Sequence, residues 1–192
     1  MSTVAQPTIT ADELLRMPDG DRFELVDGEL VERKMGSLAG WISNRVGSRF
    51  ERYAEEHGGV AFGEGGWFRC FPDDPERVRR PDACYIRAGR LSGDRIPAGH
   101  ITIAPEVVVE VISPNDVYYE VEAKVEEYLD AGVPLVWLIN PDNRSVRVFR
   151  AGQPVIQLRA HEELTGDDIL PGFRCPVAEL FPPESASKSK AP

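Results

Sequence analysis

The sequence predicts a single α/β or α+β domain in which helices pack on a β-sheet. Segments of helical and strand periodicity follow one another in the order helix, hairpin, helix, strands, helix, strands. One strand, "PEVVVEVISP" at residues 105–114, is apolar enough to be buried on at least one face. At 192 residues the chain suits one domain with a sizeable core. We expect this domain to span residues 1–183, with residues 184–192, "ESASKSKAP", as a disordered tail.

The first part of the chain predicts a short helix, a hairpin and a long helix. Thr10 is a plausible N-cap with Glu13 at the capping-box position, and "PDG" at 18–20 ends this helix. Two alternating runs follow, joined by Asp27-Gly28, a strong signal for a two-residue hairpin turn. An amphipathic helix is predicted at 38–58, with one apolar stripe formed by Ile42, Val46, Phe50 and Tyr53.

The rest of the chain predicts strands on either side of one more helix. "VAFGEGGWFRCF" at 60–71 reads as a strand made irregular by its glycines, and 81–87 as a regular one. After a polar loop comes the apolar strand at 105–114, followed by a helix at about 117–131. Three further strands are predicted from "LVWLINP", "RSVRVFR" and "PVIQLRA", at 135–141, 144–150 and 154–160.

Composition excludes several classes of protein. Hydrophobic residues make up 42 % of the chain and charged residues 28 %, which is ordinary for a globular protein. No apolar run approaches the roughly 18 residues that span a bilayer, and the N-terminus lacks the pattern of a secretion signal. Three cysteines without CxxC spacing argue against a disulfide framework and a cysteine zinc site. We therefore expect a cytoplasmic protein with no membrane partner.

The net charge of −10 limits how the chain could bind nucleic acid. Binding to a polyanion depends on basic side chains that neutralise phosphates. The one candidate patch is "RVRRPD", which contains Arg77, Arg79 and Arg80. On composition alone, a solvated loop is the simpler interpretation of this stretch.

Two carboxylates stand where burial penalises charge. In "EVVVEVI", alternation places Val107, Val109 and Val111 on one face of the strand, and Glu110 on the other with Val108 and Ile112. A buried, unpaired carboxylate costs several kcal/mol, so such groups are normally paired or bind a metal. Asp82 begins another apolar strand, although it could simply be a strand-entry residue.

The helix after residue 114 adds a candidate cation. Its predicted buried stripe is Val117, Val121, Val125 and Tyr128, and Glu120, Lys124 and Glu127 lie along one margin of that stripe. Glu120 and Lys124 could equally form an ordinary surface ion pair four residues apart. If Lys124 instead reaches over the strand end, the set Asp82, Glu110, Lys124 and Glu120 could hold Mg²⁺ and support phosphodiester hydrolysis.

Several blocks resemble a restriction-endonuclease-like family of the PD-(D/E)XK nuclease superfamily. They are "RFELVDGELVE", "RRPDACYI", "PEVVVEVISP", "KVEEYLDAGVPLVWLINP" and "LPGFRCPVAELF", which occur in the family's order between about Thr10 and Phe181. The resemblance implies a mixed central β-sheet flanked by helices, with an N-terminal hairpin. It also implies a homodimer.

The resemblance further implies a Mg²⁺ site, with Mn²⁺ as a possible substitute. Asp82 matches the aspartate of the "PD" element and Glu110 the acid of the next strand, and both would be metal ligands. Ile112 stands where the superfamily pattern has lysine, and Lys124 matches the lysine that this branch places on the following helix. Glu120 and Glu24 would support the site, with Arg77, Arg79 and Arg80 facing nucleic acid.

These observations lead to two main functional hypotheses. The first is a Mg²⁺-dependent endonuclease that hydrolyses DNA. The second is a catalytically inactive nuclease-fold module for interaction or oligomerisation. The acidity of the chain favours the second, as does the absence of the histidine that many family members carry at the start of the second helix, here "GSLAGWISNRV". A metal-dependent hydrolase with another substrate is a third.

Overall fold

The computed structural model describes residues 9–34 and 36–183 of the chain. The predicted tail at 184–192 lies outside these residues. The helices are α1 (Ala11–Arg16), α2 (Ser37–His57) and α3 (Tyr118–Asp130), with short 3-10 turns at Gly20–Arg22, Ser92–Asp94 and Val177–Leu180. The strands are β1 (Phe23–Val26), β2 (Glu29–Glu32), β3 (Val60–Phe62), β4 (Ala83–Ile86), β5 (Val107–Val111), β6 (Leu135–Asn140), β7 (Ser145–Phe149), β8 (Ile156–Arg159), β9 (Glu163–Gly166) and β10 (Leu170–Pro176).

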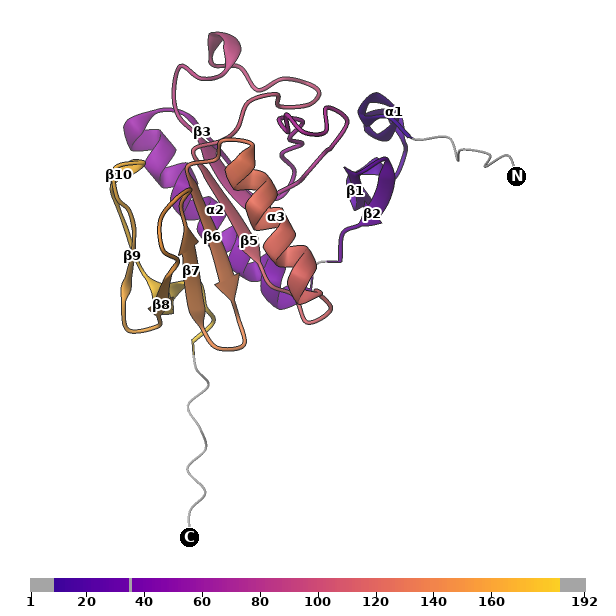
Figure 1. Ribbon diagram of the computed structural model, residues 1–192. Helices are drawn as coiled ribbons and strands as arrows, with labels where there is room; N and C mark the ends of the chain where they lie inside the picture. Colours follow the sequence, from indigo (N-terminus) through magenta and orange to yellow (C-terminus); the bar gives the residue numbers. More distant parts are fainter. Residues whose placement is uncertain (1–8, 35, 184–192) are drawn as a thin grey trace.

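A six-stranded mixed sheet forms the centre of the molecule. Its strand order is β3-β4-β5-β6-β7-β8, in which β5 and β6 are parallel and every other neighbouring pair is antiparallel. Helix α2 covers one face and α3 the other (Figure 1). The parallel β5–β6 pair requires a crossover connection, and α3 is that connection. The predicted α/β (α+β) class with a mixed central sheet flanked by helices is confirmed.

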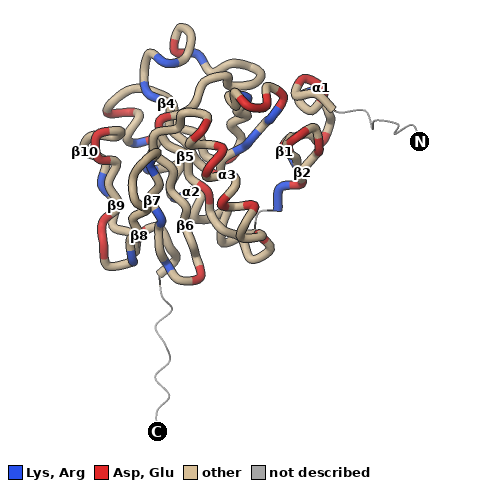
Figure 2. Tube along the Cα trace, in the orientation of Figure 1, with Lys and Arg blue, Asp and Glu red and all other residues tan. Residues whose placement is uncertain are grey.

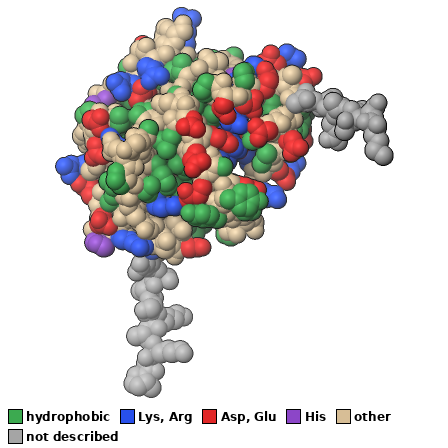
Figure 3. All heavy atoms as spheres, viewed as in Figure 1, with side chains coloured by type: hydrophobic (Ala, Val, Ile, Leu, Met, Phe, Trp, Pro, Cys, Tyr) green, Lys and Arg blue, Asp and Glu red, His purple; other side chains and the backbone are tan. Residues whose placement is uncertain are grey.

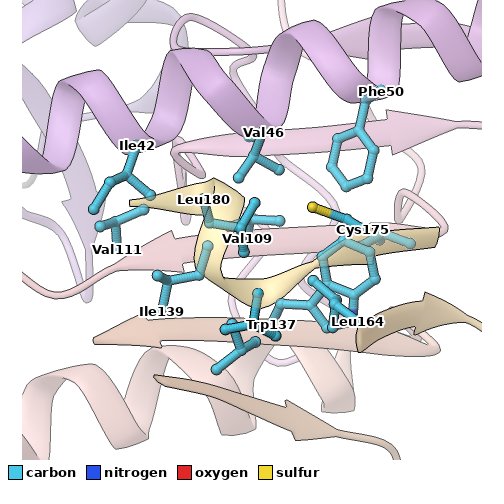
Figure 4. Close-up of a cluster of buried hydrophobic side chains, with 14 of the residues drawn as sticks. Ile42, Val46, Phe50, Val109, Val111, Trp137, Ile139, Leu164, Cys175 and Leu180 are labelled. Carbon is cyan, nitrogen blue, oxygen red and sulfur yellow. The ribbon is translucent and has the colours of Figure 1, made fainter. Parts of the chain in front are cut away.

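The larger core lies between α2 and the sheet. The predicted stripe of α2 is buried, and it packs on the valines of β5 at positions 107, 109 and 111. Figure 4 shows Ile42, Val46 and Phe50 pointing from α2 towards Val109 and Trp137. The hairpin β9–β10, which the sequence analysis did not predict, closes this core from the side with Leu164 and Cys175.

The second core lies between α3 and the opposite face of the sheet. Val125 and Tyr128 of α3 pack there with Val108 of β5. The prediction that Val117 belongs to the buried stripe is wrong. Val117 is the N-cap of α3 in extended conformation and is 39 % exposed, because the helix begins one residue later than expected.

The N-terminal segment forms a small lobe beside α3. Thr10 and Glu13 form the predicted capping box, and Asp27 and Gly28 form the hairpin turn with φ angles of 50° and 78°. Positive φ at both turn residues is the geometry that favours an Asp-Gly pair in a tight hairpin. Leu25 exchanges two backbone hydrogen bonds with Val78, at 3.0 and 2.8 Å, which fix β1 against the chain that enters β4.

One expectation about the middle of the chain needs correction. In the predicted strand at 60–71, only Val60–Phe62 is a strand, because the chain leaves the sheet at the glycines. Phe68 instead makes isolated bridges to Arg79 and Ile101. Among the described residues, no helix is long and apolar enough to cross a membrane.

Candidate active site

Asp82 and Glu110 are brought together by the pairing of β4 and β5. In the antiparallel pair β4–β5, Ala83 lies opposite Val109. Asp82 comes directly before β4, where its N–H donates to the Val109 carbonyl at 3.1 Å and its Oδ2 accepts from the Val111 N–H at 2.7 Å, so it is held by the residues on either side of Glu110 in the chain. Asp82 and Glu110 line the same pocket, and the charge of Glu110 raises the pKa of Asp82. The two carboxylates therefore converge on the face that α3 covers.

Each of the two carboxylates is held by specific donors. The Val111 N–H donates to Asp82 Oδ2 at 2.7 Å, and Arg33 Nη2 lies 3.4 Å from Asp82 Oδ1. The Tyr128 hydroxyl donates to Glu110 Oε1 at 2.8 Å. Both acids are thus fixed in place, and each keeps oxygen lone pairs available for a further ligand.

Lys124 reaches over the strand end from α3. Its Nζ atom lies 3.6 Å from Glu110 Oε2 and 3.1 Å from Glu24 Oε2. The alternative of a surface pair with Glu120 is wrong, since the ion pairs that Lys124 makes within residues 9–34 and 36–183 are with Glu24 and Glu110. Glu120 is exposed.

Glu24 joins the N-terminal hairpin to the site. Its side chain is 1 % exposed and accepts from Arg79 Nη1 at 2.9 Å and from the Arg80 N–H at 2.9 Å, besides Lys124. Arg79 also binds both oxygens of Glu127 on α3, at 2.7 and 2.8 Å. Lys124 is therefore held by a buried ion-pair network that links β1, α3 and the chain before β4.

The three buried acids of the site differ in the direction in which their pKa is shifted. Burial alone would raise the pKa of Glu24, but the charges of Lys124 and Arg79 lower it to about 2. Burial and the charge of Glu110 raise the pKa of Asp82 to about 8. Burial also raises the pKa of Glu110. For Lys124, burial would lower the pKa, but Glu110 and Glu24 together raise it. Lys124 is therefore a permanent cation, and ionisation of both Asp82 and Glu110 would place more negative charge in the site than Lys124 compensates.

This imbalance predicts a pH dependence of stability. The folded protein keeps a proton on Asp82 up to about pH 8, whereas the unfolded chain loses it near the ordinary pKa of 3.8. Because the folded state binds more protons in this window, the free energy of unfolding should fall as pH rises from about 4 to about 8. Glu24 is ionised in both states above pH 5 and adds no slope there.

Urea unfolding at pH 5 and pH 8 checks this prediction in metal-free buffer. Asp82→Asn keeps an oxygen for the Val111 N–H but cannot titrate, so its stability should decline less with pH than that of the wild type. Equal slopes in the two proteins would show that Asp82 carries its ordinary pKa.

A pocket of about 370 Å³ opens over these residues. It lies between α3 and the N-terminal hairpin, where Figure 3 shows a hollow between acidic and basic side chains. The predicted site residues that line this pocket are Glu24, Asp82, Glu110, Glu120 and Lys124. The structure thus brings together every predicted acid and the lysine, with Glu120 at the exposed margin.

The donor set fits a magnesium ion held by few protein ligands. Within the described parts of the chain, no group of three or more His, Cys, Asp or Glu side chains is arranged to hold a metal. Mg²⁺, however, is commonly held by one or two carboxylates with water completing its shell. Two carboxylates of raised pKa that line one pocket match that requirement.

The three arginines before Asp82 are not in a solvated loop. Arg77, Arg79 and Arg80 are only 6 %, 5 % and 6 % exposed, so the solvated-loop interpretation is wrong. Arg77 pairs with Asp27 and Asp73. Figure 2 shows this basic stretch running between α3 and the hairpin. Arg79 is buried against Glu24 and Glu127, which are distant in sequence. A role of the three arginines in contacting nucleic acid remains a prediction.

Sequence reasoning missed two residues of the site. Tyr128 had been assigned only to the buried stripe of α3, yet its position four residues after Lys124 places both side chains over Glu110. That spacing was a usable signal. Arg33, which contacts Asp82, follows the hairpin strand and carries no comparable signal.

The chain is similar in sequence to the Uma2 family, described as "Putative restriction endonuclease", which matches residues 11–178. It also resembles a solved structure, "a putative nuclease belonging to DUF820" from Anabaena variabilis ATCC 29413. The two share 22 % identity with a TM-score of 0.74, over 90 % of this chain and 97 % of that one. None of the curated proteins is similar enough to match. At this identity the structural likeness shows a common fold, and the family match covers most of the chain. The chain therefore belongs to the Uma2 family of restriction-endonuclease-like proteins.

Proposed function

We propose that the protein is a Mg²⁺-dependent endonuclease that hydrolyses phosphodiester bonds of DNA. The observation that carries this proposal is that two buried acids of raised pKa, Asp82 and Glu110, line one pocket, with Lys124 Nζ 3.6 Å from Glu110 Oε2. Membership of a family described as a restriction endonuclease supports the nucleic-acid substrate.

The roles of the residues follow from their contacts. Asp82 and Glu110 would hold the ion, which when bound lowers the pKa of a water ligand and neutralises charge on a phosphoryl oxygen. Lys124 stays protonated, so it donates hydrogen bonds and stabilises negative charge but does not act as a base. Tyr128 orients Glu110 through its hydrogen bond, and Glu24 orients Lys124 through its ion pair. Both contacts hold the reacting groups in place.

A cleavage assay tests the proposal. Supercoiled plasmid and a labelled linear duplex are incubated with the purified protein and Mg²⁺, Mn²⁺ or a chelator, beside an RNA duplex of the same sequence. We expect cleavage of the DNA only where a divalent ion is present. Cleavage of RNA alone would contradict the assigned substrate, and metal-independent cleavage would contradict the assigned chemistry.

The inactive-module hypothesis has one observation in its favour. Arg77 and Arg79 form ion pairs with carboxylates, and the net charge of the whole chain is −10. Little basic surface is therefore available to bind phosphate. Absence of cleavage on every substrate, with no divalent binding, would support that hypothesis. A homodimer stays a prediction, supported by the need for two sites to cut both strands of a duplex.

A further inference from the structure

Three arginines in one short stretch have different surroundings. Arg77 and Arg79 are each held by at least two carboxylates. Arg80, equally buried, takes part in none of the ion pairs found within residues 9–34 and 36–183. This contrast singles out Arg80, because a buried charge is normally paired.

The guanidinium group of Arg80 rests on an aromatic ring. Its central carbon lies 4.7 Å from the centre of the Trp67 ring. Its Nε and Nη1 atoms are enclosed and have no hydrogen-bond partner in the described structure. Nη2 has no hydrogen-bond partner there either, but it is not among the enclosed atoms, so an anion from solvent can reach it. A planar guanidinium fixed on an aromatic face is oriented for recognition of an oxyanion.

The charges around Arg80 do not neutralise its guanidinium group. Burial and the like charge of Arg33 lower the pKa of Arg80, and the acids that oppose this, Asp21, Glu24 and Glu64, act only at longer range. Arg33 itself lines the pocket and touches Asp82. Arg33 thus stands beside Asp82, and Arg80, which lies within range of the Arg33 charge, has no ion-pair partner among the described residues.

We propose that Arg80, stacked on Trp67, is a phosphate-binding residue that holds a backbone phosphate of the nucleic acid next to the scissile bond. The inference rests on the proposed function and names which of the three arginines meets the substrate. The backbone of Arg80 is fixed by Glu24, and only Pro81 separates it from Asp82, so a phosphate held there lies close to the cleaved one. The substrate supplies the anion that Arg80 lacks within residues 9–34 and 36–183, and Arg33 assists as the second cation.

Binding measurements on a cleavage-deficient background test this proposal. The affinity of the Glu110→Gln protein for a labelled DNA duplex is measured at several salt concentrations, with and without Arg80→Met. Met keeps an unbranched side chain over Trp67 but removes the charge. We expect Arg80→Met to weaken binding about tenfold, and to reduce the slope of log K against log salt concentration by about one. Arg159→Met, the same change on exposed edge strand β8, should alter neither quantity appreciably.

Stability separates a binding role from a structural one. If Arg80 binds the substrate, Arg80→Met should unfold at the same or a higher temperature than its parent, since an unpaired buried charge is removed. If Arg80 only supports Trp67, Arg80→Met should unfold at a lower temperature and keep the parent's salt slope, which would overturn the proposal. Arg80→Lys should keep the salt slope and lose part of the affinity, because a lysine keeps the charge without the planar fork.

A second probe separates this inference from the proposed function. Inorganic phosphate should raise the unfolding temperature of the wild type more than that of Arg80→Met. If the protein binds and cleaves no DNA, the nuclease proposal fails, and the phosphate experiment alone decides the role of Arg80. If DNA is cleaved but Arg80→Met binds it with unchanged affinity and salt slope, the nuclease stands and this inference is overturned.

Discussion

Replacing Glu110 with glutamine is expected to abolish metal-dependent cleavage and to leave the fold at least as stable. Glutamine keeps an oxygen that can accept from the Tyr128 hydroxyl at the 2.8 Å contact, so packing is preserved. It removes one of two anionic ligands, and the loss of about 3 kcal/mol of charge stabilisation corresponds to a rate reduction of about 100-fold or more. It also removes a buried charge of raised pKa, which the folded state tolerates poorly.

Cleavage rates and thermal unfolding, measured on the same preparations, check both halves of this prediction. Glu126→Gln, the same change on the solvent-facing side of α3, serves as the matched control and should resemble the wild type in both measurements. A Glu110→Gln protein that cleaves at the wild-type rate would remove Glu110 from the reaction. One that is much less stable would indicate that the glutamate serves the fold.

Lys124→Met is expected to cost both activity and stability, with the loss of stability depending on pH. Methionine preserves the apolar stem of the side chain but leaves Glu24, Glu110 and Asp82 without the cation that they share. Removing one member of a buried charged network typically costs about 3 to 5 kcal/mol. The loss should be greatest at pH 8, where Asp82 and Glu110 are most ionised, and smaller at pH 5, where both can hold protons.

Chemical denaturation at the two pH values measures this difference. Lys34→Met is a suitable control for stability, since Lys34 is an exposed lysine at the edge of the same pocket. A Lys124→Met protein with the same deficit at both pH values would show that the acids around Lys124 do not titrate in this range.

Much of the fold follows from local pattern. Capping, the Asp-Gly turn, the stripe of α2 and the alternation of β5 are all decided by residues close in sequence, and each was predictable. The hairpin β9–β10 was not, because "ELTG" and "LPGFRCP" lack strict alternation and are stabilised by packing on α2 and the sheet. The same holds for residues 67–80, whose path is set by single bridges to distant strands.

The site shows the same division between local and distant causes. Alternation correctly placed Glu110 and Val108 on one face, but the pairing of β4 with β5 that brings Asp82 beside Glu110 depends on contacts between distant segments. The burial of Arg79 depends on Glu24 and Glu127, which are 55 and 48 residues away. No short stretch of the sequence contains all members of such a network. The pattern around Arg77, Arg79 and Arg80 therefore indicates only a surface loop.

Titration of the metal-free protein with Mg²⁺ and Mn²⁺ in a calorimeter addresses the central point most directly: whether Asp82 and Glu110 bind a divalent ion at all. The structure predicts saturable binding of one ion at millimolar concentration or below, lost in both Asp82→Asn and Glu110→Gln and retained in Glu126→Gln. Absence of binding by the wild type, or undiminished binding by both site variants, would contradict the assignment of Asp82 and Glu110 as metal ligands.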